Sequence, residues 1–174
     1  KVLQNLQGGN LYVIAARTSM GKTGFEVAVT LKQSEHFDVG IWNGELTEKR
    51  MIRRYLSNKI GITVGDMSDD PEKYAEKILN GLDEFVKHKL HIDNKRNINI
   101  DELCNKIKYW VFTKKCKCIW LDYVQVIKLS EKMMKMLGTK TEQVGYVIDR
   151  LNEVSAICDV PIILLAQVNR EALK

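Results

Sequence analysis

The stretch Leu11–Gly24, "LYVIAARTSMGKTG", decides the fold, because an apolar run leads into a loop that ends in Gly21-Lys22-Thr23. This ending fits the phosphate-loop pattern G-x-x-x-x-G-K-[ST], but Ala16 replaces the first glycine. A phosphate cradle needs inward-facing backbone N–H groups at a helix N-terminus, a lysine for the phosphates and a hydroxyl for Mg²⁺. None of these uses the Ala16 side chain, so the loop is predicted to bind phosphate provided that φ of Ala16 stays negative. The alternative is an ordinary turn with an exposed lysine, which the flanking strand and helix disfavour.

The composition is that of one globular domain with a sizeable core. The chain has 174 residues, of which 45% are hydrophobic and 28% charged, as is usual for soluble domains. No apolar run approaches the roughly 18–20 residues of a membrane helix, and the first ten residues lack the apolar region of a signal peptide. The net charge of +5 permits a polyanionic partner without requiring one. We therefore expect a protein that does not bind membranes.

The cysteines do not form a metal-binding pattern. There is no C-x-x-C pair among Cys104, Cys116, Cys118 and Cys158, and the three histidines do not accompany them at zinc-finger spacing. Reduced thiols in or near the core of a cytoplasmic protein are the expected interpretation.

Short apolar runs alternate with longer helical patterns, which predicts an α/β fold with a mainly parallel central sheet flanked by helices. Strands are expected at Leu11–Ala16, Val39–Trp42, Leu90–Ile92, Cys118–Asp122 and Pro161–Gln167. The first, fourth and fifth are almost wholly apolar, which is typical of strands covered on both faces. Helices are expected from the loop to about Ser34, after Thr47 as N-cap, over about Pro71–Lys87, from near Ile100, and over about Glu142–Cys158.

Three strand ends carry polar side chains suited to phosphate chemistry. "CIWLD" ends in Asp122, a Walker B pattern that presents a carboxylate for Mg²⁺ where ligands of open α/β sheets bind; the alternative is an acid that caps a turn. "VGIWNGELT" places Glu45 after another strand, where it could orient the attacking water, although spacing alone fits a surface glutamate equally well. "PIILLAQ" ends in Gln167, followed by Asn169 and Arg170; Gln167 is either a γ-phosphate sensor or a simple strand exit.

Together, four segments resemble the replicative helicases of the DnaB type. They are "LQGGNLYVIAARTSMGKT", "NGELT", "IWLDYVQVI" and "VPIILLAQVNRE", in this order and over almost the whole chain. The family also carries Ala at the position of Ala16. Tyr123 and Gln125 after the Walker B aspartate separate the chain from a generic RecA-type recombinase.

The resemblance implies a P-loop NTPase with a RecA-like core, in which the Gln167 strand lies between the loop strand and the Asp122 strand. It implies ATP and Mg²⁺ as cofactors, Glu45 as the base and Gln167 as the γ-phosphate sensor. The implied catalytic residues are Lys22, Glu45 and Gln167, and the implied metal ligands are Thr23 and Asp122. The implied nucleotide contacts are Ala16, Arg17, Thr18, Ser19, Met20, Gly21, Lys22, Thr23 and Arg54.

In the family, the segment Lys128–Gly145 contributes a loop that contacts single-stranded DNA in a central channel. Here it carries Lys128, Lys132, Lys135 and Lys140 with few aromatic residues, which suits contact with the phosphate backbone and not base stacking. A solvated, mobile loop is the alternative.

The resemblance also predicts the organisation of the whole protein. Residues 1–174 are expected to be a single RecA-like ATPase domain that is truncated at its C-terminal side and lacks the N-terminal collar. The arginine finger is expected beyond Lys174, so the chain alone should bind nucleotide and hydrolyse it feebly. The implied assembly is a homo-hexamer on single-stranded DNA, with a primase or helicase loader as a further partner, in a bacterial or phage-infected cell. A recombinase-like or regulatory ATPase, or a non-hydrolysing nucleotide-binding assembly module, are the alternatives.

Two positions depart from the family pattern. Thr18 stands where the family usually has proline, which removes some pre-organisation of the loop. Gly24 stands where the family favours alanine, at a cost of roughly 1 kcal/mol in a helix.

Overall fold

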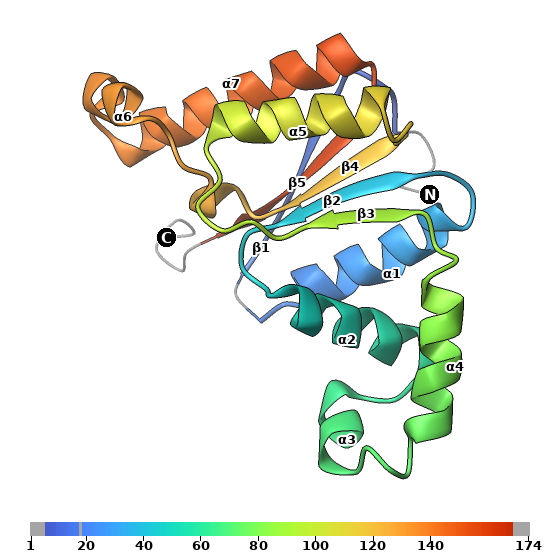
Figure 1. The fold of residues 1–174 in the computed structure, drawn as a ribbon. Helices are drawn as coiled ribbons and strands as arrows, with labels where there is room; N and C mark the ends of the chain where they lie inside the picture. Colours follow the sequence, from blue (N-terminus) through green and yellow to red (C-terminus); the bar gives the residue numbers. More distant parts are fainter. Residues whose placement is uncertain (1–5, 18, 169–174) are drawn as a thin grey trace.

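Five parallel strands form the centre of the molecule, in the spatial order β1-β5-β4-β2-β3 (Figure 1). The computed structural model describes residues 6–17 and 19–168. The strands are β1 Leu11–Ala16, β2 Val39–Asn43, β3 Leu90–Asp93, β4 Cys118–Asp122 and β5 Ile162–Gln167. This confirms the predicted α/β fold, and β5 lies between β1 and β4 as the resemblance implied. Since all strands are parallel, the carboxyl ends that carry Asp122 and Gln167 meet at one edge of the sheet.

Helices cover both faces of this sheet (Figure 1). They are α1 Lys22–Ser34, α2 Glu48–Ile60, α3 Val64–Asp69, α4 Ala75–Phe85, α5 Ile100–Phe112, α6 Glu131–Leu137 and α7 Lys140–Cys158, with a 3-10 turn at Val124–Val126. α1 and α2 lie against one face and α5 and α7 against the other, while α3 and α4 lie outside α2. In the described part of the chain, no helix has both the length and the apolar character needed to cross a bilayer.

The central strand β4 and its neighbour β2 are buried along their whole length. Successive residues of a strand face opposite sides of the sheet, so each strand contributes to two cores. Trp42 and Leu121 pack with α5 and α7, whereas Ile41 and Trp120 pack with α1 and α2. The carboxyl ends of β2 and β4 are therefore held by packing on both sides.

The strand β1 differs from the sequence prediction. It pairs only with β5 among the described strands, and Val13 is 51% exposed. The prediction that both faces of these strands are covered is therefore confirmed for β4 and for most of β5, but it is wrong for β1. The reason is position: apolar composition does not tell an edge strand from a central one.

The sequence also missed two short helices, α3 and α6, and made α4 too long. Each short helix starts at a side-chain cap: Thr63 Oγ1 accepts from the N–H of Asp66 (3.1 Å), and Ser130 Oγ from the N–H of Met133 (3.3 Å). Helices of 6 and 7 residues are too short to show a clear helical period. Thr47 does occupy the N-cap position of α2, but its side chain makes no capping hydrogen bond.

The four cysteines are free and buried, as predicted. Burial raises the pKa of the thiols of Cys116 and Cys118 to about 12, and it also raises the pKa of the Cys104 and Cys158 thiols. Within the described residues, no cluster of three or more His, Cys, Asp or Glu side chains could hold a metal ion.

We expect the native protein to resist thiol reagents, because only the accessible thiolate reacts. At about pH 8, the reaction of the folded protein with a chromogenic disulfide should be about two orders of magnitude slower than that of the denatured protein. The denatured sample should release four equivalents of chromophore. Prompt reaction of one equivalent with the folded protein would contradict this prediction.

Candidate nucleotide-binding site

The loop after β1 ends at a helix N-terminus that is not capped by the side chain of its N-cap residue. Gly21 is the N-cap residue of α1 and makes no side-chain capping bond, and the first turn contains no acidic residue. The first N–H groups of α1 therefore remain available to donate hydrogen bonds to a ligand, and the helix dipole adds a partial positive charge at this end. This arrangement suits an anionic ligand such as phosphate.

The backbone of this loop explains why alanine is tolerated at position 16. Positive φ angles occur at Ser19 (65°) and Gly21 (83°), while Ala16 is the last residue of β1. Glycine is therefore needed at Gly21, where φ is positive, and not at Ala16. The predicted backbone role of Ala16 agrees with this geometry; Thr18 lies outside the described residues.

A cavity of about 350 Å³ opens beside the loop, at the carboxyl ends of the strands. Its lining contains most of the residues predicted from the sequence: Ser19, Gly21, Lys22, Thr23, Glu45, Arg54, Asp122 and Gln167. Gly24, which was not predicted as a contact, also lines the cavity, whereas Ala16 does not. The ammonium group of Lys22 donates to the carbonyl oxygen of Ala16 at 3.3 Å. Arg17 and Met20 belong to the loop but are not part of this lining, and the Met20 side chain is 71% exposed.

Asp122 is the best-anchored group of the cavity. Its side chain is buried, and Oδ2 accepts from the hydroxyl of Thr23 (3.0 Å) and from Nδ2 of Asn43 (3.1 Å). Burial raises the pKa of Asp122, the hydrogen bond from Thr23 opposes this, and the charge of Glu45 raises it further. A carboxylate next to a hydroxyl is the oxygen-donor set expected for Mg²⁺.

Asn43 joins this carboxylate to Glu45, a role that the sequence analysis missed. While Nδ2 donates to Asp122, Oδ1 accepts from the N–H groups of Glu45 (3.1 Å) and Leu46 (2.8 Å). Asn43 is fully buried, and it lies opposite Asp122 in the β2–β4 pairing. The signal in the sequence was a polar residue at the end of an apolar strand that precedes the candidate base.

Gln125 has a similar linking function. Its side-chain amide donates to the carbonyl of Gln167 (2.8 Å) and accepts from the N–H of Gln167 (3.4 Å). The turn after β4 is thereby fastened to the end of β5, where Gln167 lines the cavity. The sequence indicated Gln125 only as a family feature. Asn169 and Arg170, which follow, lie outside the described residues.

Glu26 is a second group that the sequence analysis did not single out. It lies one turn beyond Thr23 on α1 and is fully buried. Neither carboxyl oxygen makes a hydrogen bond that satisfies normal geometry with a described residue. Burial, and next the charge of Asp122, raise the pKa of Glu26 well above its usual value. Its position on the helical stripe with Val27 and Thr30 was the available signal.

Replacement of Glu26 by glutamine should weaken the pH dependence of stability in Mg²⁺-free buffer. Because the folded pKa is raised, the folded state keeps a proton that the unfolded state loses, so stability falls as pH rises from the ordinary pKa of glutamate towards the raised pKa of Glu26. The Glu26→Gln variant should show a shallower fall and a higher stability at the upper end of this range. Urea unfolding at several pH values measures the slope of the free energy of unfolding against pH and its value at the upper end of the range. The control Glu48→Gln removes an exposed glutamate and should keep the slope of the original protein; an equal slope in Glu26→Gln would contradict the assignment.

The four lysines predicted to contact DNA are all exposed. Lys128 precedes α6, Lys132 and Lys135 lie on α6, and Lys140 begins α7. The segment expected to be a loop therefore contains a helix. Lys128 and Lys140 also line a cavity of about 390 Å³ that lies between the turn after β4, α6 and α7.

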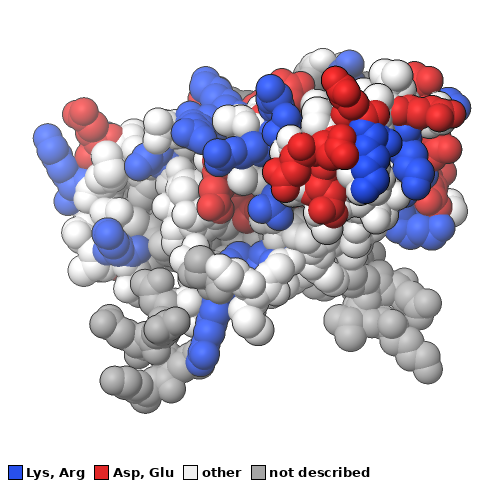
Figure 2. All heavy atoms as spheres, turned by 90° about the horizontal axis from the view of Figure 1, so that it is seen from below, with Lys and Arg blue, Asp and Glu red and all other residues white. Residues whose placement is uncertain are grey.

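The charges on another side of the molecule are mixed. Figure 2, the view from below Figure 1, shows a group of Lys and Arg side chains beside a region where acidic and basic side chains alternate.

Comparisons with known proteins show the family of the chain. The family model of the DnaB-like helicase C terminal domain matches residues 1–174. A probable replicative DNA helicase of Guillardia theta is 24% identical over 97% of this chain, and the replicative DNA helicase DnaB of Buchnera aphidicola is 27% identical over 95%. The matches cover 28% and 36% of those two proteins, so the chain spans about a third of their length.

Two solved structures share the fold. A DnaB-like replicative helicase, studied with its interactions with primase, superposes with a TM-score of 0.84 at 20% identity, over 95% of this chain and 40% of that one. The ATPase domain of G40P superposes with a TM-score of 0.82 at 22% identity, over 93% of this chain and 58% of that one.

Proposed function

Because the chain belongs to the family of DnaB-like helicase C-terminal domains, we propose that it is the ATP-hydrolysing motor domain of a replicative DNA helicase. Residues 1–174 would form one RecA-like ATPase domain of a protein that acts as a homo-hexamer in the cytoplasm of a bacterial or phage-infected cell. It would couple ATP hydrolysis to movement on single-stranded DNA and to duplex unwinding. A primase or a helicase loader is the expected further partner.

One observation carries this proposal: a single cavity is lined by Lys22, Thr23, Glu45, Asp122 and Gln167. These residues come from four separate segments of the chain and meet only because of the parallel strand order. The uncapped N-terminus of α1 supplies donors for phosphate oxygens, and Lys22 adds a positive charge that can reach them. Arg54 of α2 lines the same cavity and is a further cation that the nucleotide could contact.

The oxygen donors of the site fit Mg²⁺. Thr23 Oγ1 and Asp122 Oδ2 already lie 3.0 Å apart, and Mg²⁺ commonly binds through one or two protein oxygens with substrate phosphates and water as its other ligands. The described residues contain no cluster of three metal-ligating side chains, which is consistent with this shared coordination. When bound, the ion would neutralise charge on the phosphates.

Glu45 is the group best placed to act as the base. Its N–H is bonded to Asn43 Oδ1, so the residue follows the end of β2 at a fixed position, and its side chain lines the cavity. A carboxylate there can accept a hydrogen bond from water and orient it for attack on the terminal phosphate. Gln167, at the end of β5, would contact the γ-phosphate and act as its sensor, so that the position of this strand end would depend on whether the phosphate is bound.

Replacement of Glu45 by glutamine in the complete protein should abolish turnover but preserve nucleotide binding. Glutamine has the same size but is not a base, so we expect kcat to fall by about two orders of magnitude or more. The affinity for a fluorescent ATP analogue should change little. Phosphate release and analogue titration on the same sample measure the two quantities.

Lys22→Ala is the contrasting variant, since it removes the charge that faces the phosphates. It should lose affinity for the analogue as well as turnover. Unchanged affinity in Lys22→Ala would refute the phosphate-loop assignment, and normal turnover in Glu45→Gln would show that another residue is the base.

Neutralisation of the four lysines around α6 tests the contact with DNA. The test variant changes four residues to glutamine: Lys128, Lys132, Lys135 and Lys140. It should bind single-stranded DNA more weakly, and the slope of log affinity against log salt concentration should become less steep by about one unit for each phosphate that is no longer neutralised. DNA-stimulated ATP hydrolysis should fall, while hydrolysis without DNA should remain. A matched variant changes Lys73, Lys77, Lys87 and Lys89, which are exposed on or beside α4. Equal DNA binding by both variants would remove the assigned segment from the DNA interface.

A further inference from the structure

The loop between β3 and α5 makes direct contacts with the segment that contains Glu45. Nη2 of Arg96 donates to the carbonyl oxygen of Glu45 at 3.1 Å. Nδ2 of Asn94 donates to the carbonyl oxygen of Leu46 at 3.3 Å. Two consecutive carbonyls of the Glu45 segment are therefore held by two side chains of one loop.

These contacts complement those made by Asn43. Asn43 accepts from the N–H groups of Glu45 and Leu46, whereas Asn94 and Arg96 donate to the carbonyl groups of the same two residues. Both residues are thus fixed through their N–H and their carbonyl groups, which restricts rotation of the backbone that carries the Glu45 side chain.

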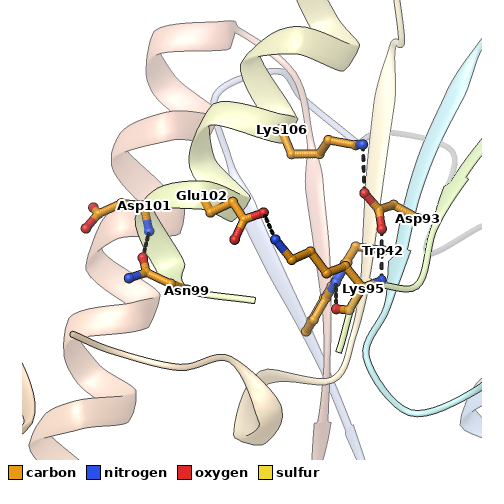
Figure 3. Close-up of polar contacts among 7 residues, drawn as sticks. All are labelled: Trp42, Asp93, Lys95, Asn99, Asp101, Glu102 and Lys106. Atoms are coloured by element: carbon orange, nitrogen blue, oxygen red, sulfur yellow. Dashed lines mark hydrogen bonds and ion pairs between the residues drawn. The ribbon is translucent and has the colours of Figure 1, made fainter. Parts of the chain in front are cut away.

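The loop that makes these contacts is itself braced (Figure 3). Nε1 of Trp42 donates to the carbonyl of Lys95 (3.1 Å), and the N–H of Lys95 donates to Asp93 Oδ1 (2.8 Å). The other oxygen of Asp93 pairs with the ammonium group of Lys106 on α5 at 2.7 Å. Burial acts to raise the pKa of Asp93, but the bonds from Lys106 and Lys95 outweigh it and the pKa is lowered.

The far end of the loop is anchored as well. The N–H of Lys128 donates to the carbonyl of Ile98 (2.8 Å), and the N–H of Ile100 donates to the carbonyl of Lys128 (2.9 Å). Asn99 caps α5 by accepting from the N–H of Asp101 at 2.7 Å. Asn94 and Arg96 therefore project from a segment that is fixed to the sheet, to α5 and to the start of the Lys128 segment.

From this arrangement we propose that Asn94 and Arg96 are positioning residues that hold Glu45 in the orientation needed for ATP hydrolysis. The inference rests on the proposed function, in which Glu45 is the base. Neither residue lines the nucleotide cavity, so they act through the backbone of Glu45 and Leu46 and not on the substrate. A displacement of about 1 Å at a reacting group can lower a rate by as much as a hundredfold.

The test uses the complete protein and the double variant Asn94→Ala/Arg96→Ala. Its kcat for ATP should fall about tenfold, while the affinity for a fluorescent ATP analogue stays within about twofold, because the phosphate loop is untouched. Arg96→Lys in the Asn94→Ala background, which restores a donor, should recover part of the lost kcat. The control Lys95→Ala changes the residue between the two, whose side chain pairs with Glu102 and does not contact the Glu45 segment; it should match the original protein.

The outcomes separate this inference from the proposed function. If Glu45→Gln abolishes turnover but the double variant keeps its full kcat, the proposed function stands and the positioning role is overturned. Parallel losses of affinity and kcat, or an equal loss in Lys95→Ala, would indicate a general structural effect and also overturn it. If Glu45→Gln itself retains turnover, the proposed function fails first.

Discussion

The rest of the site depends on the hydrogen bonds that the carboxylate of Asp122 accepts. This carboxylate is buried at the end of β4, and it accepts hydrogen bonds from Thr23 on α1 and Asn43 on β2. Burial of a carboxylate is unfavourable unless hydrogen-bond donors surround it. Because the two donors come from α1 and β2, the same bonds also fix these two segments relative to β4. The loop after β1, the end of β4 and the strand before Glu45 are thereby held in one arrangement, as electrostatic pre-organisation of the proposed nucleotide site would require.

The features that the sequence predicted well depend on local pattern. The five strands follow from apolar runs, and the cavity lining follows from the rule that parallel strands present their carboxyl ends at one edge. The edge position of β1 could not be predicted in this way, because Leu11–Ala16 is as apolar as the central strands. The helix α6 was missed because its seven residues are too few to show a clear helical period, although Met133 and Leu137 do pack against the core.

The site residues that the sequence analysis missed were missed for a different reason. Asn43, Gln125 and Arg96 act through hydrogen bonds to residues that are distant in sequence or to backbone groups. A side chain that bonds a backbone carbonyl leaves no pattern at its partner, since every residue has a carbonyl. Glu26 is the instructive exception: an acid on the buried stripe of a helix is unfavourable by itself, and an unfavourable residue in a core position often marks a functional site.

The electrostatic interaction of buried Glu26 with Asp122 has a consequence for the whole site. Burial is the main cause that raises the pKa of both carboxyl groups; the charge of Asp122 raises that of Glu26 further, and the charge of Glu45 raises that of Asp122 further. The donors that favour ionised Asp122, Thr23 and Asn43, are part of the same hydrogen-bond network that reaches Glu45. The carboxylate of Asp122 and the backbone of Glu45, the proposed base, are therefore linked through one side chain, Asn43. A change that moves Asn43 would alter both, so the proposed metal-binding and base-positioning parts of the site form one structural unit.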